Sequence, residues 1–370
     1  MHKIVHMTSA HSRYDTRIFY KMCSSLASKS YDTSLIVADT LKNEKKNNVS
    51  IISTGHKENS RLKRMLYDTQ RVYKKALDLD GHLYHIHDPE LIPAGLKLKK
   101  NGKKVIFDAH EDLPQQILSK PYLSPLFRKA VSKFFEYFEH INLKKFDAII
   151  AATPFISNKI KQTNPNTENI NNYPLLSEFK DLKNIDWSHK KQEIAYVGGI
   201  SKIRGISEII KSLNFSKDIR LNLAGSFSEQ KLKEELKKEL GWQKVNELGW
   251  LDRQNVIATL KKSQLGLVTL YPTINYIDSL PVKMFEYMSA GLPVIASHFP
   301  LWKSIITHTE CGLCVDPLDP QAIWSAILEI TSNPEKAKKM GENGRNAVEK
   351  KYNWQIEEQK LLKLYEKVLN

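Results

Sequence analysis

The alternation of short apolar strands with amphipathic helices constrains the fold of this chain more than any other feature. Apolar runs predict strands at Lys3–Met7, Thr33–Ala38, Leu83–His87, Lys104–Asp108 and Ala148–Ala152. Helical spacing predicts helices at Thr16–Ser28 and Leu91–Lys99 between them. Because parallel neighbouring strands need a crossover connection, this order predicts a doubly wound α/β domain with helices on both faces of a parallel sheet.

A second set of strands and helices follows a stretch rich in Pro and Asn, Thr163–Pro174, which predicts a linker or domain crossing. Its predicted strands are Glu193–Val197, Arg220–Ala224, Lys244–Leu248 and Leu265–Leu270. Its predicted helices are Gly205–Leu213, Glu229–Leu240 and Gln254–Lys262. We therefore expect two Rossmann-like domains, 1–170 and 171–354, and a last helix at Trp354–Leu369 with one buried face.

Composition indicates a globular protein without a membrane span. The chain has 370 residues, of which 41% are hydrophobic and 26% charged, and no run approaches the roughly 18 consecutive apolar residues of a span. The first residues lack the apolar core of a signal peptide, so we expect a cytoplasmic protein. The pair Cys311 and Cys314 lacks the second pair that a structural zinc site needs, and a turn into an apolar strand is the simpler interpretation.

The net charge of +15 is uneven, with +11 in residues 1–170 and +4 in the rest. Nucleic acid, a polyanionic polymer or an anionic membrane surface could be the partner, although Lys-rich surfaces also simply solvate a protein. Two basic and aromatic stretches, 61–75 and 120–145, can form amphipathic helices that suit an anionic membrane. Their aromatic residues could equally belong to the core; those of the second stretch are Phe127, Phe134, Phe135, Tyr137 and Phe138.

The segment 279–297 places one acidic residue in an otherwise apolar helix-to-strand unit. Pro281 opens a helix that Gly291 ends, and an apolar strand follows at once. A carboxylate at the start of such a helix, here Glu286, can accept two hydrogen bonds from a vicinal diol such as a ribose. The alternative is a surface Glu that interacts with the helix dipole.

This segment resembles the donor-site signature of the retaining glycosyltransferases of family 4, in which an acidic residue is followed eight positions later by a Glu. Asp278 and Glu286 hold these positions, although most members have Glu at the first. The resemblance implies the two-domain GT-B fold, with the last helix, 355–370, packing on the N-terminal domain. It also implies that Glu286 holds the ribose hydroxyls and that the backbone of Leu280–Lys283 approaches a diphosphate at the helix N-terminus.

The loop Tyr196–Gly205 leaves a strand and enters a helix, as phosphate-binding loops do, and its spacing is not that of a dehydrogenase. It resembles the "Gly-Arg … Lys-Gly" element of the family. Arg204 stands where the diphosphate-binding Lys usually stands, and Gly199 where an Arg often does. The resemblance implies that Arg204 binds the leaving diphosphate, with Lys202 or Lys283 compensating for the missing cation. Two further matches are the segments that contain Gly225 and Trp250.

Three polar clusters in the first domain follow predicted strands, where open α/β sheets bind ligands. His110 resembles a family residue that approaches the transferred sugar, whereas carboxylates of the segment 108–112 could instead cap the next helix. His85 and His87 share one strand face, but no second ligand cluster supports a metal site. The family resemblance of these clusters implies an acceptor side made of Arg13, Asp15, Arg17, His87, Asp88 and Glu111. Surface salt bridges are an equal alternative for the first three.

The resemblance implies a retaining glycosyltransferase that moves a sugar, most commonly from UDP, to a glycan or lipid-linked acceptor in cell-surface polysaccharide biosynthesis. It implies no metal and no cofactor beyond the donor, with His110, Asp278 and Glu286 as the catalytic residues. A GT-B UDP-sugar 2-epimerase is an alternative that shares the donor site. A noncatalytic basic protein that binds nucleic acid or membrane is the alternative from another class.

Overall fold

The computed structural model of the protein describes residues 1–119, 124–182, 187 and 190–370. The chain divides into two compact units. The N-terminal unit contains Met1–Asn172 with Gln355–Asn370, and the C-terminal unit contains Tyr173–Trp354. Among the described residues, no helix is both long enough and apolar enough to cross a bilayer.

The N-terminal unit is built on an eight-stranded sheet in the order β3-β4-β2-β1-β5-β6-β7-β8. Only β3 and β4 pair antiparallel; every other neighbouring pair is parallel. The central strands are buried on both faces, as a sheet covered by helices requires. The strands are β1 (Lys3–Thr8), β2 (Asp32–Val37), β3 (Glu44–Lys46), β4 (Val49–Ser53), β5 (Leu83–Ile86), β6 (Lys104–Ala109), β7 (Ala148–Ala151) and β8 (Thr167–Asn169).

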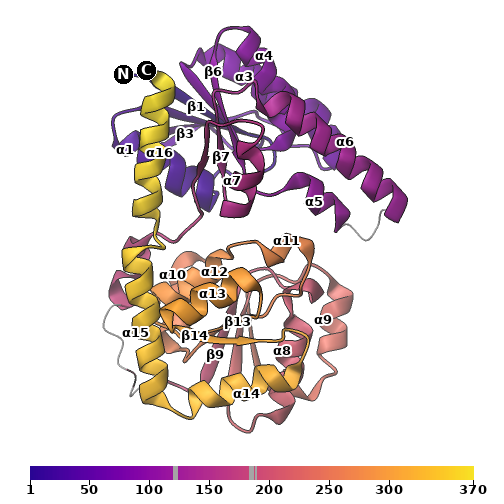
Figure 1. Cartoon of the computed structure of the whole chain (residues 1–370), viewed down its shortest axis with the longest axis vertical. Coiled ribbons are helices and arrows are strands. Elements are labelled where there is room, and N and C mark those ends of the chain that lie inside the picture. The colour runs from indigo at the N-terminus through magenta and orange to yellow at the C-terminus, as the bar shows by residue number, and fades with distance from the viewer. Residues whose placement is uncertain (120–123, 183–186, 188–189) are drawn as a thin grey trace. The chain divides into compact units, whose positions relative to one another are not determined.

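Helical segments connect these strands and cover the sheet (Figure 1). The first connection begins as a π-helical stretch, η1, which continues as α1. The segments are η1 (Thr16–Cys23), α1 (Ser24–Ser28), α2 (Arg61–Lys63), η2 (Arg64–Asp68), α3 (Thr69–Leu79), η3 (Pro89–Leu91), α4 (Ile92–Lys100), α5 (Leu113–Leu118), α6 (Pro125–Leu143), α7 (Pro154–Lys161) and α16 (Trp354–Leu369).

The C-terminal unit contains a six-stranded, fully parallel sheet in the order β11-β10-β9-β12-β13-β14. Its strands are β9 (Glu193–Val197), β10 (Arg220–Ala224), β11 (Val245–Gly249), β12 (Gly266–Val268), β13 (Val294–Ser297) and β14 (Gly312–Val315). Its helices are η4 (Leu176–Leu182), η6 (Lys202–Arg204), α8 (Ile206–Ser212), η7 (Leu213–Phe215), α9 (Gln230–Leu236), η8 (Leu240–Lys244), α10 (Arg253–Lys262), α11 (Ile274–Ile277), α12 (Val282–Ser289), α13 (Pro300–Thr309), α14 (Pro320–Thr331) and α15 (Pro334–Lys350).

The α/β architecture predicted from the sequence is confirmed, and two details differ. The stretch 163–174 is not only a connection, because it contributes the edge strand β8, whose backbone pairs with β7. The helix predicted at 229–240 ends at Leu236, and a separate turn, η8, follows, in which a Cβ on Gly241 would lie 2.0 Å from the Ile210 carbonyl oxygen. Residues 120–123 of the second amphipathic stretch lie outside the described residues, and the rest forms α6.

Strand register brings functional loops together at the carboxyl edge of each sheet. In the N-terminal unit, His6 on β1 pairs with His85 on β5, which in turn pairs with Ile106 on β6. The loops that leave these three strands therefore start side by side. In the C-terminal unit the loop after β9 and the helix α12 take the corresponding place next to the sheet.

Candidate active site

The loop after β9 brings two glycine-containing segments into close contact. Gly198 has φ +122° and Gly225 has φ +148°, conformations that side chains with a Cβ rarely adopt. A Cβ on Gly225 would lie 1.9 Å from the Gly198 carbonyl oxygen, so the approach of the two segments requires glycine there. Gly225 thus shapes the loop through its backbone.

Two cations lie against this loop. A Cβ added to Gly199 would lie 3.0 Å from a guanidinium nitrogen of Arg204, and one added to Gly198 would lie 3.4 Å from Cε of Lys283. Arg204 also donates a long hydrogen bond, 3.4 Å, to the Gly199 carbonyl. The structure therefore brings together three of the residues that the sequence assigned to the diphosphate: Gly199, Arg204 and Lys283.

The ammonium group of Lys283 is buried and, within the described part of the chain, has no hydrogen-bond partner. It lies over the ring of Tyr196, 3.7 Å from the centroid, which is a cation–π contact. Burial, and then repulsion from Arg204, lower the pKa of Lys283 well below its usual value. An anion in this loop would supply the missing counter-charge.

Glu286 lies in the second turn of α12 rather than at its start, the position inferred from the sequence. Its side chain is 13% exposed, and one carboxylate oxygen is 2.7 Å from a terminal nitrogen of Arg253. Arg253 also binds Glu178 at 2.7 Å. The sequence analysis missed Arg253, which has no motif of its own and acts as a fixed partner that orients Glu286.

The remaining residues assigned to the donor occupy loops of the same unit. Asp278 ends α11 and is half-buried, and Leu280 follows it in a segment that Trp302 fixes by a 2.7 Å hydrogen bond to the Ser279 carbonyl. Lys202 is exposed in η6, and Trp250 is 76% exposed after β11. Their roles toward a donor stay predictions.

In the N-terminal unit, Asp108 at the end of β6 is the centre of a buried polar cluster. Arg17 binds it through two hydrogen bonds of 2.9 and 2.7 Å. The carboxylate of Asp108 also contacts His110 Nε2 at 2.8 Å and His87 Nδ1 at 3.2 Å. Burial opposes ionisation of Asp108, but the charge of Arg17 and the contacts with His110 and His87 together outweigh it, so the pKa of the carboxyl lies well below its usual value. The cluster fixes the ring of His110, which is 19% exposed.

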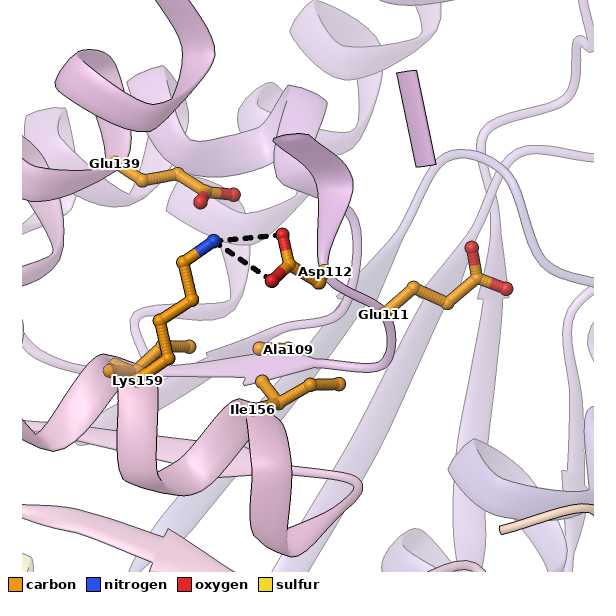
Figure 2. Close-up of a pocket in the computed structure, with 7 residues that line it drawn as sticks. Ala109, Glu111, Asp112, Glu139, Ile156 and Lys159 are labelled. Carbon is orange, nitrogen blue, oxygen red and sulfur yellow. Dashed lines mark hydrogen bonds and ion pairs between the residues drawn. The ribbon is translucent and has the colours of Figure 1, made fainter. Parts of the chain in front are cut away.

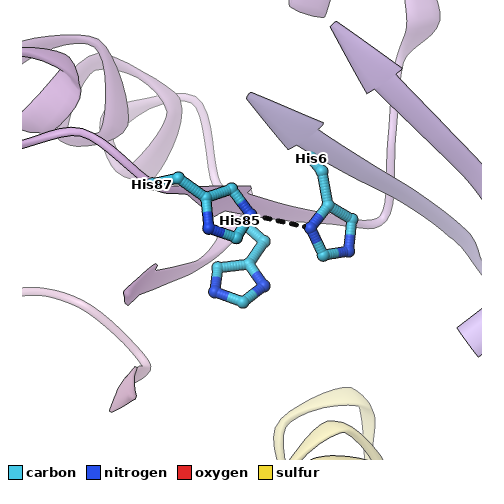
Figure 3. Close-up of side chains that lie close together, drawn as sticks. All are labelled: His6, His85 and His87. Carbon is cyan, nitrogen blue, oxygen red and sulfur yellow. Dashed lines mark hydrogen bonds between the residues drawn. The ribbon is translucent and has the colours of Figure 1, made fainter. Parts of the chain in front are cut away.

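Three further contacts extend this cluster into the core. His87 Nε2 is 2.9 Å from His6 Nδ1, and Figure 3 marks this hydrogen bond with a dashed line. The hydroxyl of Tyr365 on α16 is 3.3 Å from His6 Nε2 and 2.6 Å from His85 Nδ1. Burial is the main cause that lowers the pKa of His6, His85 and His87, so these rings are neutral near neutral pH.

Two groups within this cluster have a spacing that could hold a metal ion: His6, His85 and His87, and His87, Asp108 and His110. The ring nitrogens of His6 and His87 all have protein partners, and only His85 Nε2 is buried without one in the described chain. Hydrogen bonds explain why the three histidines of the first group lie close together. In the second group, the ion pair with Arg17 balances the charge of Asp108.

Most of the residues assigned to the acceptor side have partners inside the unit. Arg13 is 6% exposed and binds Asp39 through two 2.8 Å bonds, and it also contacts Glu44. Asp15 caps η1 by accepting from the backbone of Arg17 and Ile18. These contacts are buried or local, so they give both arginines and Asp15 a structural role beside any role in binding.

Asp88 lies in the loop after β5 and binds residues at the end of β1. It accepts from the hydroxyl of Thr8 at 2.8 Å and from the backbone of Ser9 at 2.6 Å. It also binds His11 Nδ1 at 2.8 Å. The sequence analysis did not assign His11, although a His in the loop between the first strand and the first helix was a visible signal.

A pocket lies between the end of β6 and the helices α6 and α7 (Figure 2). Its lining includes Ala109 and Glu111, the two sequence neighbours of His110. Asp112 caps α5 and binds Lys159 at 2.8 Å, which confirms the capping alternative for that residue. Glu111 is exposed and contacts Gln116. Glu139 lies on the wall of the pocket, and burial, together with the charge of Asp112, raises its pKa to about 7.

Replacement of Glu139 by Gln should change how stability depends on pH. The folded protein binds the Glu139 proton more tightly than the unfolded chain, so ionisation destabilises the fold as the pH rises from the ordinary value of 4.5 to about 7. Melting temperatures at about pH 5 and about pH 8 should show that Glu139→Gln is more stable than wild type only at the higher pH. Glu136→Gln, an exposed change on the same helix, is the control; an equal pH dependence in all three proteins would contradict the assignment.

Comparison with known proteins gives one consistent result. Residues 16–170 match the description "Glycosyltransferase Family 4", and residues 177–347 match "Glycosyl transferases group 1". An uncharacterised glycosyltransferase of Methanocaldococcus jannaschii is 23% identical over 74% of this chain and 71% of its own.

Solved structures share the fold over the whole chain. The sucrose-phosphate synthase of Thermosynechococcus elongatus has a TM-score of 0.79 at 17% identity, covering 100% of this chain and 99% of its own. Anabaena HepE, solved with UDP and glucose, has a TM-score of 0.73 at 13% identity, covering 99% of this chain and 100% of its own. The protein therefore belongs to the family 4 glycosyltransferases and has the GT-B fold.

Proposed function

We propose that the protein transfers a sugar, with retention, from a UDP-sugar to a hydroxyl group of a glycan or lipid-linked acceptor in cell-surface polysaccharide biosynthesis. The observation that carries the donor site is the buried, unpartnered ammonium of Lys283 beside the Gly198–Gly199 loop. Anabaena HepE, which was solved in complex with UDP and glucose and with UDP-glucose, supports a uridine nucleotide. The D-rhamnosyltransferase WbpZ of Pseudomonas aeruginosa, 30% identical over 28% of this chain, is one relative that transfers a sugar.

The diphosphate of the donor would enter the space that Arg204, Lys283 and the first amides of α12 face. Two cations and free N–H groups stabilise the negative charge that develops on the leaving group, which replaces the role of a metal ion. Glu286, oriented by Arg253, keeps its second carboxylate oxygen available to the ribose. Proximity of the two substrates then provides most of the remaining acceleration, with attack on the face from which the diphosphate leaves.

His110 would contact the reacting sugars from the N-terminal unit. Its Nε2 binds Asp108, which holds the ring in place, and its side chain is 19% exposed. We assign no metal and no cofactor to the reaction. The family assignment does not favour the epimerase and nucleic-acid alternatives.

The donor site predicts a specific response to nucleotides. UDP should raise the melting temperature of the wild-type chain, because it binds only the folded state. Lys283→Met and Arg204→Ala should each weaken UDP binding by about tenfold or more, as expected for loss of a charge-assisted hydrogen bond. Lys262→Met, an exposed change on α10, should respond like wild type. A wild-type response of Lys283→Met to UDP would refute this site.

We also propose that α6 docks on an anionic membrane surface to reach a lipid-linked acceptor. The side chains of Leu126, Phe127, Phe134 and Tyr137 are between 57% and 83% exposed, so they do not belong to the core. Phe135 and Phe138 are half-buried instead. Exposed Lys129 and Lys133 flank the apolar stripe, a combination that suits an anionic interface.

Vesicle sedimentation tests the docking surface. The wild-type chain should bind phosphatidylglycerol vesicles more strongly than phosphatidylcholine vesicles at low salt, and the double substitution Phe134→Ser and Tyr137→Ser should abolish the difference. Leu328→Ser, a similarly exposed apolar position on α14, is the control. Equal binding of the wild type to both vesicle types would rule out this surface.

A further inference from the structure

A chain of hydrogen bonds runs through the core of the N-terminal unit from α16 to Asp108. It begins at the hydroxyl of Tyr365, which lies 2.6 Å from His85 Nδ1 and 3.3 Å from His6 Nε2. His6 Nδ1 lies 2.9 Å from His87 Nε2, and His87 Nδ1 lies 3.2 Å from the Asp108 carboxylate. All five side chains are at most 1% exposed, so their partners are each other rather than bulk water.

The contact between His6 and His87 has the geometry of a direct N–H···N hydrogen bond. The ring centroids are 5.1 Å apart, the ring planes are 14° from parallel, and the two facing nitrogens are 2.9 Å apart (Figure 3). These nitrogens therefore lie almost on the line between the two ring centres, as an aligned hydrogen bond requires. One ring must donate and the other accept, and the partners at the two ends of the chain decide which.

The carboxylate end determines the first two hydrogens. Burial opposes ionisation of Asp108, but Arg17 and the adjacent histidines hold its pKa well below its usual value, so the carboxylate can only accept. His87 Nδ1 therefore carries a hydrogen, since a bare lone pair there would face the anionic oxygen. Burial lowers the pKa of His87, so the ring is neutral, and its Nε2 has a lone pair that accepts from His6 Nδ1.

The hydroxyl of Tyr365 determines the rest. Burial lowers the pKa of His6 and raises that of Tyr365, so His6 Nε2 has a lone pair and the hydroxyl keeps its hydrogen. If the hydroxyl donates to His6, it accepts from His85 Nδ1, and only the lone pair of His85 Nε2 has no partner in the described chain. Donation to His85 instead would leave two buried atoms unpaired, His6 Nε2 and an N–H at His85 Nε2, which is the more costly arrangement.

Three successive hydrogens in this arrangement point toward Asp108. Tyr365 donates to His6, His6 donates to His87, and His87 donates to the carboxylate. Hydrogen bonds that are linked in one direction polarise one another, so each donor strengthens the bond at the charged end. The arrangement also holds all three buried histidines in the tautomer that carries its hydrogen on Nδ1.

We propose that Tyr365 is a positioning residue whose hydroxyl sets the tautomers of the three buried histidines and thereby fixes the Asp108 carboxylate. Asp108 in turn lies 2.8 Å from His110 Nε2, so the last helix acts on the candidate active site through the core. The tautomers follow from the contacts alone, whereas their bearing on catalysis rests on the proposed glycosyl transfer.

Nuclear magnetic resonance of the full chain, labelled with nitrogen-15 in its histidine rings, tests the proposal at neutral pH. Ring nitrogen shifts and couplings distinguish the two neutral tautomers, and His6, His85 and His87 should all carry their hydrogen on Nδ1 in the wild type. In Tyr365→Phe the ring nitrogens of His6 and His85 should shift. The Nδ1 proton of His87 should move upfield, because its bond to the carboxylate loses the support of the chain.

Tyr31→Phe is the matched control. Its ring packs against Tyr365 with centroids 6.3 Å apart, and the change removes a hydroxyl that is not part of the chain, so the His87 proton should not move. Finding the other neutral tautomer at His6 or His87 in the wild type would overturn the proposal, even if Tyr365→Phe did not fold. A His87 proton that is unchanged in Tyr365→Phe, or that moves equally in Tyr31→Phe, would also overturn it.

The same samples separate this inference from the proposed function. UDP should raise the melting temperature of the wild type and of Tyr365→Phe alike, because the residues assigned to the diphosphate belong to the C-terminal unit. A protein that is stabilised by UDP but lacks the expected tautomers refutes only the role of Tyr365. One that shows the tautomers but no response to UDP supports that role and counts against the donor site.

Discussion

The burial of the Lys283 amine without a hydrogen-bond partner in the described chain is the constraint on which the proposed donor site depends. Lys283 lies between the Tyr196 ring and the glycine loop, and Arg204 stands close enough to lower its pKa further. The charge of Glu286 and the Tyr196 ring offset only part of the cost of a charged amine here, because the pKa of Lys283 still lies well below its usual value. Under the proposed function, a bound diphosphate would offset both the burial of the amine and its repulsion from Arg204.

In the N-terminal unit the buried charge is a carboxylate, that of Asp108, and it is paired inside a polar cluster. Arg17 neutralises Asp108, and the ordered contacts through His87, His6 and Tyr365 leave few polar atoms unsatisfied. Because Arg17 pairs with Asp108, its guanidinium group is buried in the core. The outer edge of the cluster is partly open to solvent, since the side chains of His11 and His110 are 31% and 19% exposed.

Much of this account was predictable from the sequence, because strand and helix periodicity and the glycine loop are local signals. The α/β architecture and the grouping of Gly199, Arg204 and Lys283 are examples. Long-range pairing was not predictable. Nothing near Arg253 indicates that it binds Glu286, and the edge strand β8 lacks an apolar pattern because it pairs through its backbone and Asn side chains.

The central claim is that Lys283 receives the diphosphate of the donor. Calorimetric titration of UDP at neutral and mildly alkaline pH, in buffers of different ionisation enthalpy, tests it most directly. The account predicts net proton uptake on binding, because the diphosphate restores the charged form of an amine whose pKa burial has lowered. The uptake should disappear in Lys283→Arg, whose guanidinium stays charged. Binding of UDP with the same proton balance in both proteins, or no binding of UDP to the wild type, would contradict the account.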